Sequence, residues 1–300
     1  MPTLKANFIA DWVAYLRQGL VGTQGWPASE IAALSDSDVP LHYFDAQRRR
    51  VALAPRTIRL ADDFICPPEQ EAGWKALQEK IVKGEDINPH LSTRHASLFN
   101  SDGLLSEWGV HHFHLGTTPH TRHAGFVSRT GPLVYALVTD QAFCAINVYT
   151  HQSFEDSTIL ESIHRNWPEL IRRYRAKGVT GGVWTQDQRR AIRSKHANVL
   201  TRTKDGTVYM TIGIATSAAG ISFEVIKQAD FFQDQVRAFQ DNFEKQGLAK
   251  LLPLLQQQGL DGEDEVEAGL KLSRDSVQVF FPKYNVLANV TFTKEPAFSQ

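Results

Sequence analysis

The chain has 300 residues and a formal net charge of −1; 42% of its residues are hydrophobic and 22% are charged. This composition is typical of a globular protein and excludes a disordered chain. The near-zero charge excludes an overall field that would hold nucleic acid or an anionic membrane. The two cysteines stand singly, which excludes a cysteine-based zinc site. Because no apolar run approaches the roughly 18 residues that cross a bilayer, we expect a cytoplasmic protein without membrane contact.

The first half of the chain predicts a helix followed by hairpin strands. Apolar residues recur at helical spacing from Ile9 to Leu20. Apolar runs between turn residues then predict a strand over 110–115 and a hairpin made of 132–139 and 142–150. A long helix is expected over 153–177, because a helix-opening segment precedes a stripe of apolar residues there.

The second half predicts a helix over 185–195, a hairpin over 199–214, a strand over 221–226 and a closing hairpin over 277–292. Because strands come in hairpins with helices between them, we predict an α+β fold. It has a central, mainly antiparallel sheet built from hairpins and flanked by amphipathic helices.

The glycine-bearing segment 178–182 is the candidate domain boundary. It would separate a histidine-rich α+β domain with an N-terminal helix, residues 1–178, from a second α+β half, residues 183–300. The alternative is that both halves belong to one composite domain.

Histidines are concentrated in one part of the chain. Nine of the eleven lie between residues 90 and 164, and three of these, His111, His112 and His114, fall within four positions. Imidazole changes charge near neutral pH and also binds transition metals. This cluster is therefore the candidate functional site.

Side chains alternate along a strand, which separates the three histidines. His112 and His114 point to one face, with Cβ atoms about 7 Å apart at a rise of roughly 3.3 Å per residue. His111 points to the other face with Phe113, which belongs in the core, so we expect His111 to be buried and hydrogen-bonded. His112 and His114 are then presented on the outward face, where two ring nitrogens can meet one phosphate or one metal ion.

Other residues are expected to complete this site. His151 ends the second hairpin strand and shares parity with Tyr149, so both are candidates for the same pocket. Arg129 immediately precedes the hairpin and supplies a guanidinium, which binds phosphate bidentately. The loop between the strands contributes three substrate-binding candidates, His120, Arg122 and His123.

Arg165, on the helix that follows His151, is a further substrate-binding candidate. Together with the basic stretch 172–175 it could lie against a nucleic-acid backbone. The alternative interpretation is an ordinary solvated helix face.

The function that we expect is metal-independent cleavage of RNA. One neutral histidine takes the proton of a ribose 2′-hydroxyl, and a protonated histidine or a tyrosine donates a proton to the leaving 5′-oxygen. Arg129 stabilises the charged phosphorane. The scarcity of carboxylates favours this chemistry, since Asp102 and Glu107 are the only acidic residues between positions 90 and 123.

Two alternatives remain open. His112, His114 and His151 could bind zinc or another transition metal that activates water, which would make the protein a metal-dependent hydrolase. The histidines could instead be structural, and the protein would then be a non-catalytic module that binds another protein through its helices.

The stretch from Trp108 to His151 resembles the compact metal-free ribonucleases of the RelE/EndoU-like toxin class, which also carry His, Arg and Tyr on a small antiparallel sheet. The resemblance implies acid and base roles for the same three histidines, phosphate binding by Arg129, and support by Tyr149 or Tyr135. It also implies a toxin or phage-defence setting, with RNA as substrate and a protein partner such as an antitoxin. This chain is longer than such toxins, so its flanking helices and final hairpin need another role.

Overall fold

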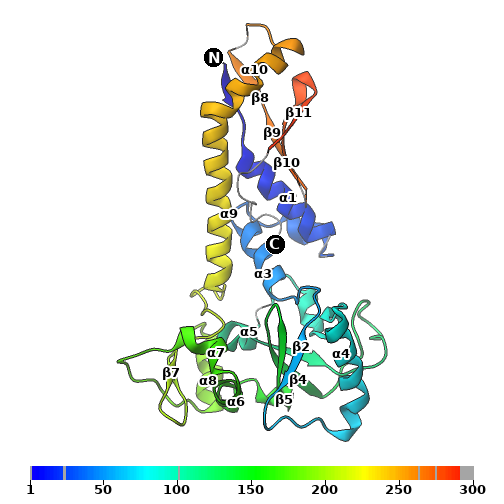
Figure 1. The fold of residues 1–300 in the computed structure, drawn as a ribbon, viewed down its shortest axis with the longest axis vertical. Coiled ribbons are helices and arrows are strands. Elements are labelled where there is room, and N and C mark those ends of the chain that lie inside the picture. Colours follow the sequence, from blue (N-terminus) through cyan, green and yellow to red (C-terminus); the bar gives the residue numbers. More distant parts are fainter. Residues whose placement is uncertain (1, 23–24, 101, 263, 274–275, 291–300) are drawn as a thin grey trace. The chain divides into compact units, whose positions relative to one another are not determined.

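The computed structural model describes residues 2–22, 25–100, 102–262, 264–273 and 276–290. The chain divides into two compact units (Figure 1). The terminal unit joins both ends of the chain, residues 1–44 and 226–300, and the central unit comprises residues 45–225. The α+β class is confirmed. The expected boundary at 178–182 lies inside the central unit, because the two ends of the chain pack together.

The terminal unit combines helices with two small sheets. Its helices are α1 (Phe8–Gly22), α2 (Ala28–Ala32), α3 (Asp38–Arg48), α9 (Phe223–Asn242) and α10 (Leu248–Gln257), and α3 and α9 run on into the central unit. Its strands are β1 (Thr3–Lys5), β8 (Glu265–Glu267), β9 (Gly269–Leu272), β10 (Val277–Phe281) and β11 (Val286–Asn289). β1 pairs with β8 in parallel, and β9, β10 and β11 form an antiparallel sheet. The predicted closing hairpin is confirmed as β10 and β11; residues 291–292 lie outside the described residues.

Helix α1 confirms the N-terminal prediction. Phe8, Trp12, Leu16 and Leu20 recur every four residues and are all buried, because this spacing places them on one helix face. The ring of Phe8 stacks on that of Phe239 in α9, with centroids 5.5 Å apart. The two ends of the chain therefore share one apolar core.

The central unit is built on a four-stranded sheet in the order β2–β5–β4–β3. Its strands are β2 (Thr57–Leu60), β3 (Val110–His114), β4 (Pro132–Val138) and β5 (Ala142–Thr150). Strands β3, β4 and β5 pair antiparallel, which confirms the predicted strand and hairpin, and β2 joins β5 in parallel. A β-bulge between Tyr135 and Ala136 shifts the register of β4 against β5.

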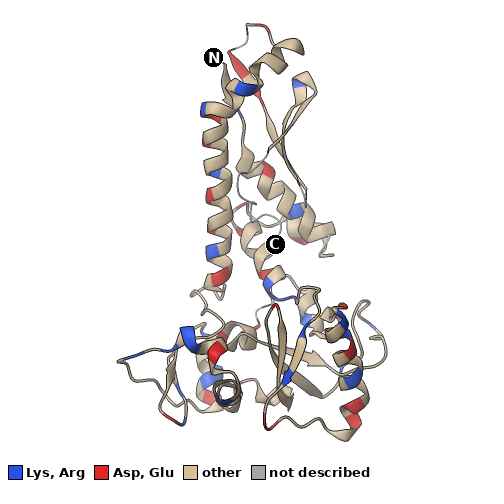
Figure 2. Cartoon of the chain, in the orientation of Figure 1, with Lys and Arg blue, Asp and Glu red and all other residues tan. Residues whose placement is uncertain are grey.

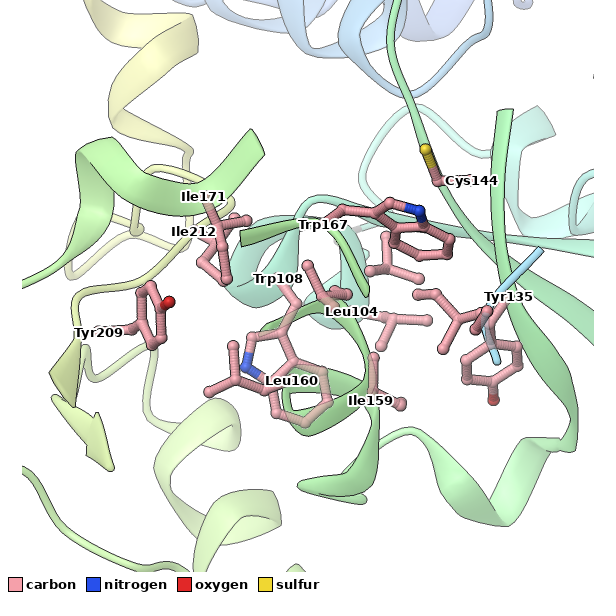
Figure 3. Close-up of a cluster of buried hydrophobic side chains, with 14 of the residues drawn as sticks. Leu104, Trp108, Tyr135, Cys144, Ile159, Leu160, Trp167, Ile171, Tyr209 and Ile212 are labelled. Carbon is pink, nitrogen blue, oxygen red and sulfur yellow. The ribbon is translucent and has the colours of Figure 1, made fainter. Parts of the chain in front are cut away.

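Helices cover both faces of this sheet. On one face, Trp74, Leu77 and Ile81 of α4 (Glu71–Lys83) share a core with Phe113 and other strand residues. On the other face lies the core shown in Figure 3, to which α5 (Gly103–Trp108), α6 (Thr158–Asn166) and α7 (Pro168–Ile171) contribute. The helix predicted over 153–177 is divided into α6 and α7, because Pro168 lacks the N–H that a continuous helix needs.

The remainder of the central unit contains α8 (Gln186–Ser194) and the short hairpin of β6 (Thr201–Arg202) and β7 (Val208–Tyr209). A capping box between Thr185 and Gln188 begins α8, as the predicted helix over 185–195 requires. The strand predicted over 221–226 is wrong, since α9 begins at Phe223. The hydroxyl of Ser222 accepts the N–H of Glu224 at 3.3 Å, and this local bond favours a helix start over an extended chain.

Basic and acidic residues are interspersed over the helices and strands of both units (Figure 2). Within the described residues, no helix is both long enough and apolar enough to cross a membrane.

Candidate functional site

Strand β3 carries the histidine cluster with the predicted alternation. His112 stands opposite Tyr135 of β4, on the face covered by α5 and α6, and His111 shares the other face with Phe113. Neither face is open. His112 is 7% exposed and His114 1% exposed, because helices cover both sides of the sheet. The expectation that these two rings lie on an outward face is therefore wrong.

His151 is the member of the cluster that reaches solvent. It follows the last residue of β5 and is half-buried. Its ring centroid lies 5.6 Å from that of His114 and 6.4 Å from that of His112. The ring of Phe154 packs 4.9 Å from His112 and 5.6 Å from His151. His151, distant along the chain, thus meets the two histidines of β3, and Phe154 packs against His112 and His151.

Arg129 places a positive charge next to His151. The Nη2 atom of this exposed arginine lies 3.4 Å from Nε2 of His151. A guanidinium can only donate, so Nε2 of His151 is the acceptor and its neutral ring holds the proton on Nδ1. Burial, followed by the charges of Arg129 and Arg94, lowers the pKa of His151. The result is a neutral imidazole whose lone pair lies beside a guanidinium.

The protonation of His114 follows from its neighbours. Its Nδ1 accepts the backbone N–H of Thr130 at 3.1 Å, so the proton of the neutral ring is on Nε2. Nε2 is buried and has no hydrogen-bond partner in the described part of the chain. Burial and the charge of Arg129 lower the pKa of His114 to about 3, so the ring is neutral at pH 7. The backbone is fixed here as well, because His90 donates from Nδ1 to the carbonyl of His114 at 2.8 Å.

A buried carboxylate that the sequence analysis did not assign lies on the other side of His112. Oδ2 of Asp102 is 3.9 Å from Nδ1 of His112 and 3.6 Å from Nε2 of His95. Oδ1 accepts the N–H of Leu105 at 3.0 Å and so caps α5. Burial alone would raise the pKa of Asp102, but these contacts outweigh it and the pKa is lowered. The sequence signal was the acidic residue immediately before a helix.

Burial dominates the titration of His112. It lowers the pKa of His112 to about 4, although the charge of Asp102 acts in the opposite direction. The second acid near the cluster, Glu107, forms ion pairs with Arg189 and Arg193 of α8. Arg193 also donates to the carbonyl of Phe154 at 2.6 Å. Glu107 and Arg193 therefore hold in place the aromatic ring that covers His112 and His151.

The two tyrosines of the site are adjacent. The rings of Tyr135 and Tyr149 meet edge to face at 5.1 Å, and the Tyr135 hydroxyl donates to the carbonyl of Thr150 at 2.9 Å. Burial raises the pKa of both hydroxyl groups. Both tyrosines therefore stay protonated at neutral pH and support the strand end that carries His151.

The three loop residues that are candidates for substrate binding, His120, Arg122 and His123, contact one another. The rings of His120 and His123 lie 4.8 Å apart, and Nδ1 of His120 accepts the backbone N–H groups of Arg122 and His123 at 3.0 and 3.1 Å. These bonds hold the loop in a compact turn.

Arg165 lies on α6 and is bound by two carboxylates. Its guanidinium is 2.6 Å from Asp62 and 2.9 Å from Asp63. This pairing occupies the group that the sequence analysis assigned to substrate.

His111 is buried as expected, and among the described residues its Nδ1 has no hydrogen-bond partner. In the described part of the chain, no group of three or more His, Cys, Asp or Glu side chains is arranged to hold a metal ion. The alternative set of His112, His114 and His151 is accordingly not arranged as a metal site.

Comparison with known proteins gives no relative: no family model, no curated protein and no solved structure matches the chain. The chemistry of the site must therefore be argued from its own geometry.

Proposed function

We propose that the central unit cleaves RNA phosphodiesters without a metal ion, with His151 as general base and Arg129 as the phosphate-binding group. The observation that supports this most is the 3.4 Å contact between the exposed Arg129 and the half-buried His151, beside two buried imidazoles. An exposed guanidinium is accessible to a phosphate from solvent and binds it through paired N–H groups. The lone pair that would accept a proton lies next to it.

In the proposed step, Nε2 of His151 takes the proton of a ribose 2′-hydroxyl. The 2′-oxygen forms a bond to phosphorus, and the bond from phosphorus to the 5′-oxygen breaks. Arg129 offsets the charge that develops on the phosphorane. The products are a 2′,3′-cyclic phosphate and a 5′-hydroxyl that takes its proton from water. The hydroxide that this water leaves takes the proton from His151 and restores the neutral ring.

Water acts as the general acid that protonates the 5′-oxygen, because neither the histidines nor Tyr135 can take this role. The pKa values of His112, His114 and His151 are all lowered, so at pH 7 these rings are mainly neutral imidazoles and not imidazolium acids. The hydroxyl of Tyr135 is occupied by the carbonyl of Thr150, and its raised pKa makes it a weaker acid still. The protonated histidine or tyrosine expected from the sequence is therefore not part of the proposal.

The test is cleavage of labelled single-stranded RNA in the presence of EDTA, with analysis of the new ends. We expect 2′,3′-cyclic phosphate ends. We expect His151→Asn and Arg129→Gln each to lower kcat/KM by about 10²- to 10⁴-fold, the range for loss of a general base or a charge-stabilising group. His42→Gln and Arg237→Gln, in the terminal unit, are matched controls that should cleave like the wild type.

Three outcomes contradict the proposal. Cleavage that persists in both His151→Asn and Arg129→Gln would place the chemistry elsewhere or in a contaminant. Cleavage that EDTA abolishes would favour the metal-dependent alternative. A folded protein that cleaves no RNA would leave the non-catalytic module as the better interpretation.

A further inference from the structure

A second site is suggested by a cavity at the end of the sheet in the central unit, where β3 begins and β4 ends. The cavity has a volume of about 270 Å³. His111 and Leu137 line it from the strands, and Arg48, Leu170, Arg173 and Ile212 line it from the surrounding helices and loops. This volume is well above that needed for a single water molecule and leaves room for a small organic molecule.

The cavity wall contains a buried polar atom that lacks a partner. His111 is 7% exposed, and its Nδ1 makes no hydrogen bond. Burial lowers the pKa of His111 to about 3, so the ring is neutral at pH 7. Buried polar groups are almost always hydrogen-bonded, because an unmade bond leaves the cost of desolvation unrecovered. Nδ1 is closed to solvent in this structure, so a polar atom of a ligand in the cavity would become its partner only after the ring turns toward the cavity.

The charges that line the cavity favour an anion. Arg48 is nearly buried; its guanidinium donates to Ser106 at 3.1 Å and to Asp45 at 3.3 Å, and its Nε is buried without a hydrogen bond. Arg173 is exposed, and its guanidinium lies 4.8 Å from the ring centroid of Tyr174 and donates to the Tyr174 hydroxyl at 2.7 Å. Within the described residues Arg173 forms no ion pair. Because Arg48 is already paired with Asp45, Arg173 supplies the unpaired positive charge of the lining, and Glu224 is its acidic residue.

The rest of the wall is apolar and part of it is strained. Leu170, Ile171 and Ile212 line the cavity, and the last two belong to the core shown in Figure 3. Ile214, also in the lining, has φ of +66°, a conformation that β-branched residues rarely adopt. Such strain occurs preferentially where a ligand is held.

We propose that this cavity binds a small organic carboxylate, with its charged group at Arg173 and Arg48 and its apolar body against Leu170, Ile171 and Ile212. The unpaired guanidinium of Arg173 fits a carboxylate, and the apolar wall fits a hydrocarbon body. This inference is independent of the RNA-cleavage proposal, because it uses the end of the sheet and none of the atoms assigned to cleavage.

The experiment is isothermal titration calorimetry of the full-length chain with sodium octanoate as probe. 1-Octanol and acetate are the matched probes, because the first lacks the charge and the second lacks the apolar body. We expect octanoate to bind with one site per chain, and both matched probes to bind at least tenfold more weakly. Arg173→Gln should weaken octanoate binding at least tenfold. Arg172→Gln removes the neighbouring exposed charge outside the lining and should leave the affinity unchanged.

Ile212→Asn places a polar group in the apolar wall and should weaken octanoate binding, provided that circular dichroism shows an unchanged fold. The proposal is overturned if octanoate does not bind at millimolar concentration. It is overturned equally if octanol binds as tightly as octanoate, or if Arg172→Gln and Arg173→Gln weaken binding to the same extent. Because the readout is binding and not RNA cleavage, these results do not depend on whether the chain is a ribonuclease.

Discussion

We predict that the buried histidines make the protein sensitive to mild acid, and the size of this effect follows from the structure. Burial lowers the pKa of His111 and His114 to about 3 and that of His112 to about 4, whereas imidazole in an unfolded chain titrates near 6.5. The unfolded state therefore binds more protons than the folded state below pH 6.5, and the free energy of unfolding falls as the pH falls. His90 and His151 shift in the same direction.

Each proton that the unfolded state binds in excess of the folded state lowers the free energy of unfolding by about 1.4 kcal/mol for every unit by which the pH falls. This full slope is reached once the imidazole of the unfolded chain is fully protonated. Between pH 6.5 and pH 5, one such ring costs roughly 1.5 kcal/mol and three cost roughly 5 kcal/mol, which is a large part of the stability of a typical domain. Asp102 contributes little in this window, because its carboxyl is ionised in both states there.

The assay is urea unfolding followed by tryptophan fluorescence at a series of pH values from 7.5 to 5. The central unit contains four of the six tryptophans, so its unfolding dominates the signal. His111→Gln should reduce the slope of stability against pH by about one proton, and His123→Gln, which removes an exposed ring outside the cluster, should leave it unchanged. A wild-type stability that is flat between pH 6.5 and 5 would refute the reasoning, as would imidazole titrations by NMR with midpoints near 6.5 for the buried rings.

Three further predictions concern the support of the site and its chemistry. Glu107→Gln should lower the free energy of unfolding by about 3–5 kcal/mol, measured by urea unfolding, because it leaves the buried Arg189 without its ion-pair partner; a loss below 1 kcal/mol would contradict this. Gly73→Ala should destabilise the protein although alanine favours helices, because a Cβ would lie 1.8 Å from the carbonyl oxygen of Leu115; an unchanged or raised melting temperature would show that the helix can shift. The rate of RNA cleavage should rise with increasing pH and level off before pH 6.5 is reached, because the base is His151 with a lowered pKa and no protein group acts as the acid. A bell-shaped profile would show that a second group titrates.

The predictable parts of the fold are the helices and strands that the spacing of nearby apolar residues indicates. The helical stripe of α1 and the apolar runs of β4 and β5 each fixed one element, because burial of one face needs a particular period. Alternation along β3 likewise separated His112 from His111. These inferences use only residues that are neighbours in sequence.

The parts that were not predictable depend on contacts between distant segments. The pairing of β1 with β8 closes the terminal unit across some 260 residues, and no local pattern indicates it. The burial of His112 and His114 depends on where α5 and α6 pack, and the sequence of β3 alone does not indicate this. The contact of Asp102 with His95 and His112 arises in the same way, so the sequence could indicate a helix cap there but not a carboxylate beside the cluster.

The central claim is that His151 and Arg129 form one phosphate site, and a crystal structure with bound RNA tests it most directly. A short oligoribonucleotide with 2′-fluoro groups in place of the 2′-hydroxyls cannot be cleaved by the proposed step and should remain intact in the crystal. The account predicts a phosphate bonded to the guanidinium of Arg129, with the 2′-position next to Nε2 of His151. RNA bound away from both residues, or a metal ion held between His112, His114 and His151, would contradict it.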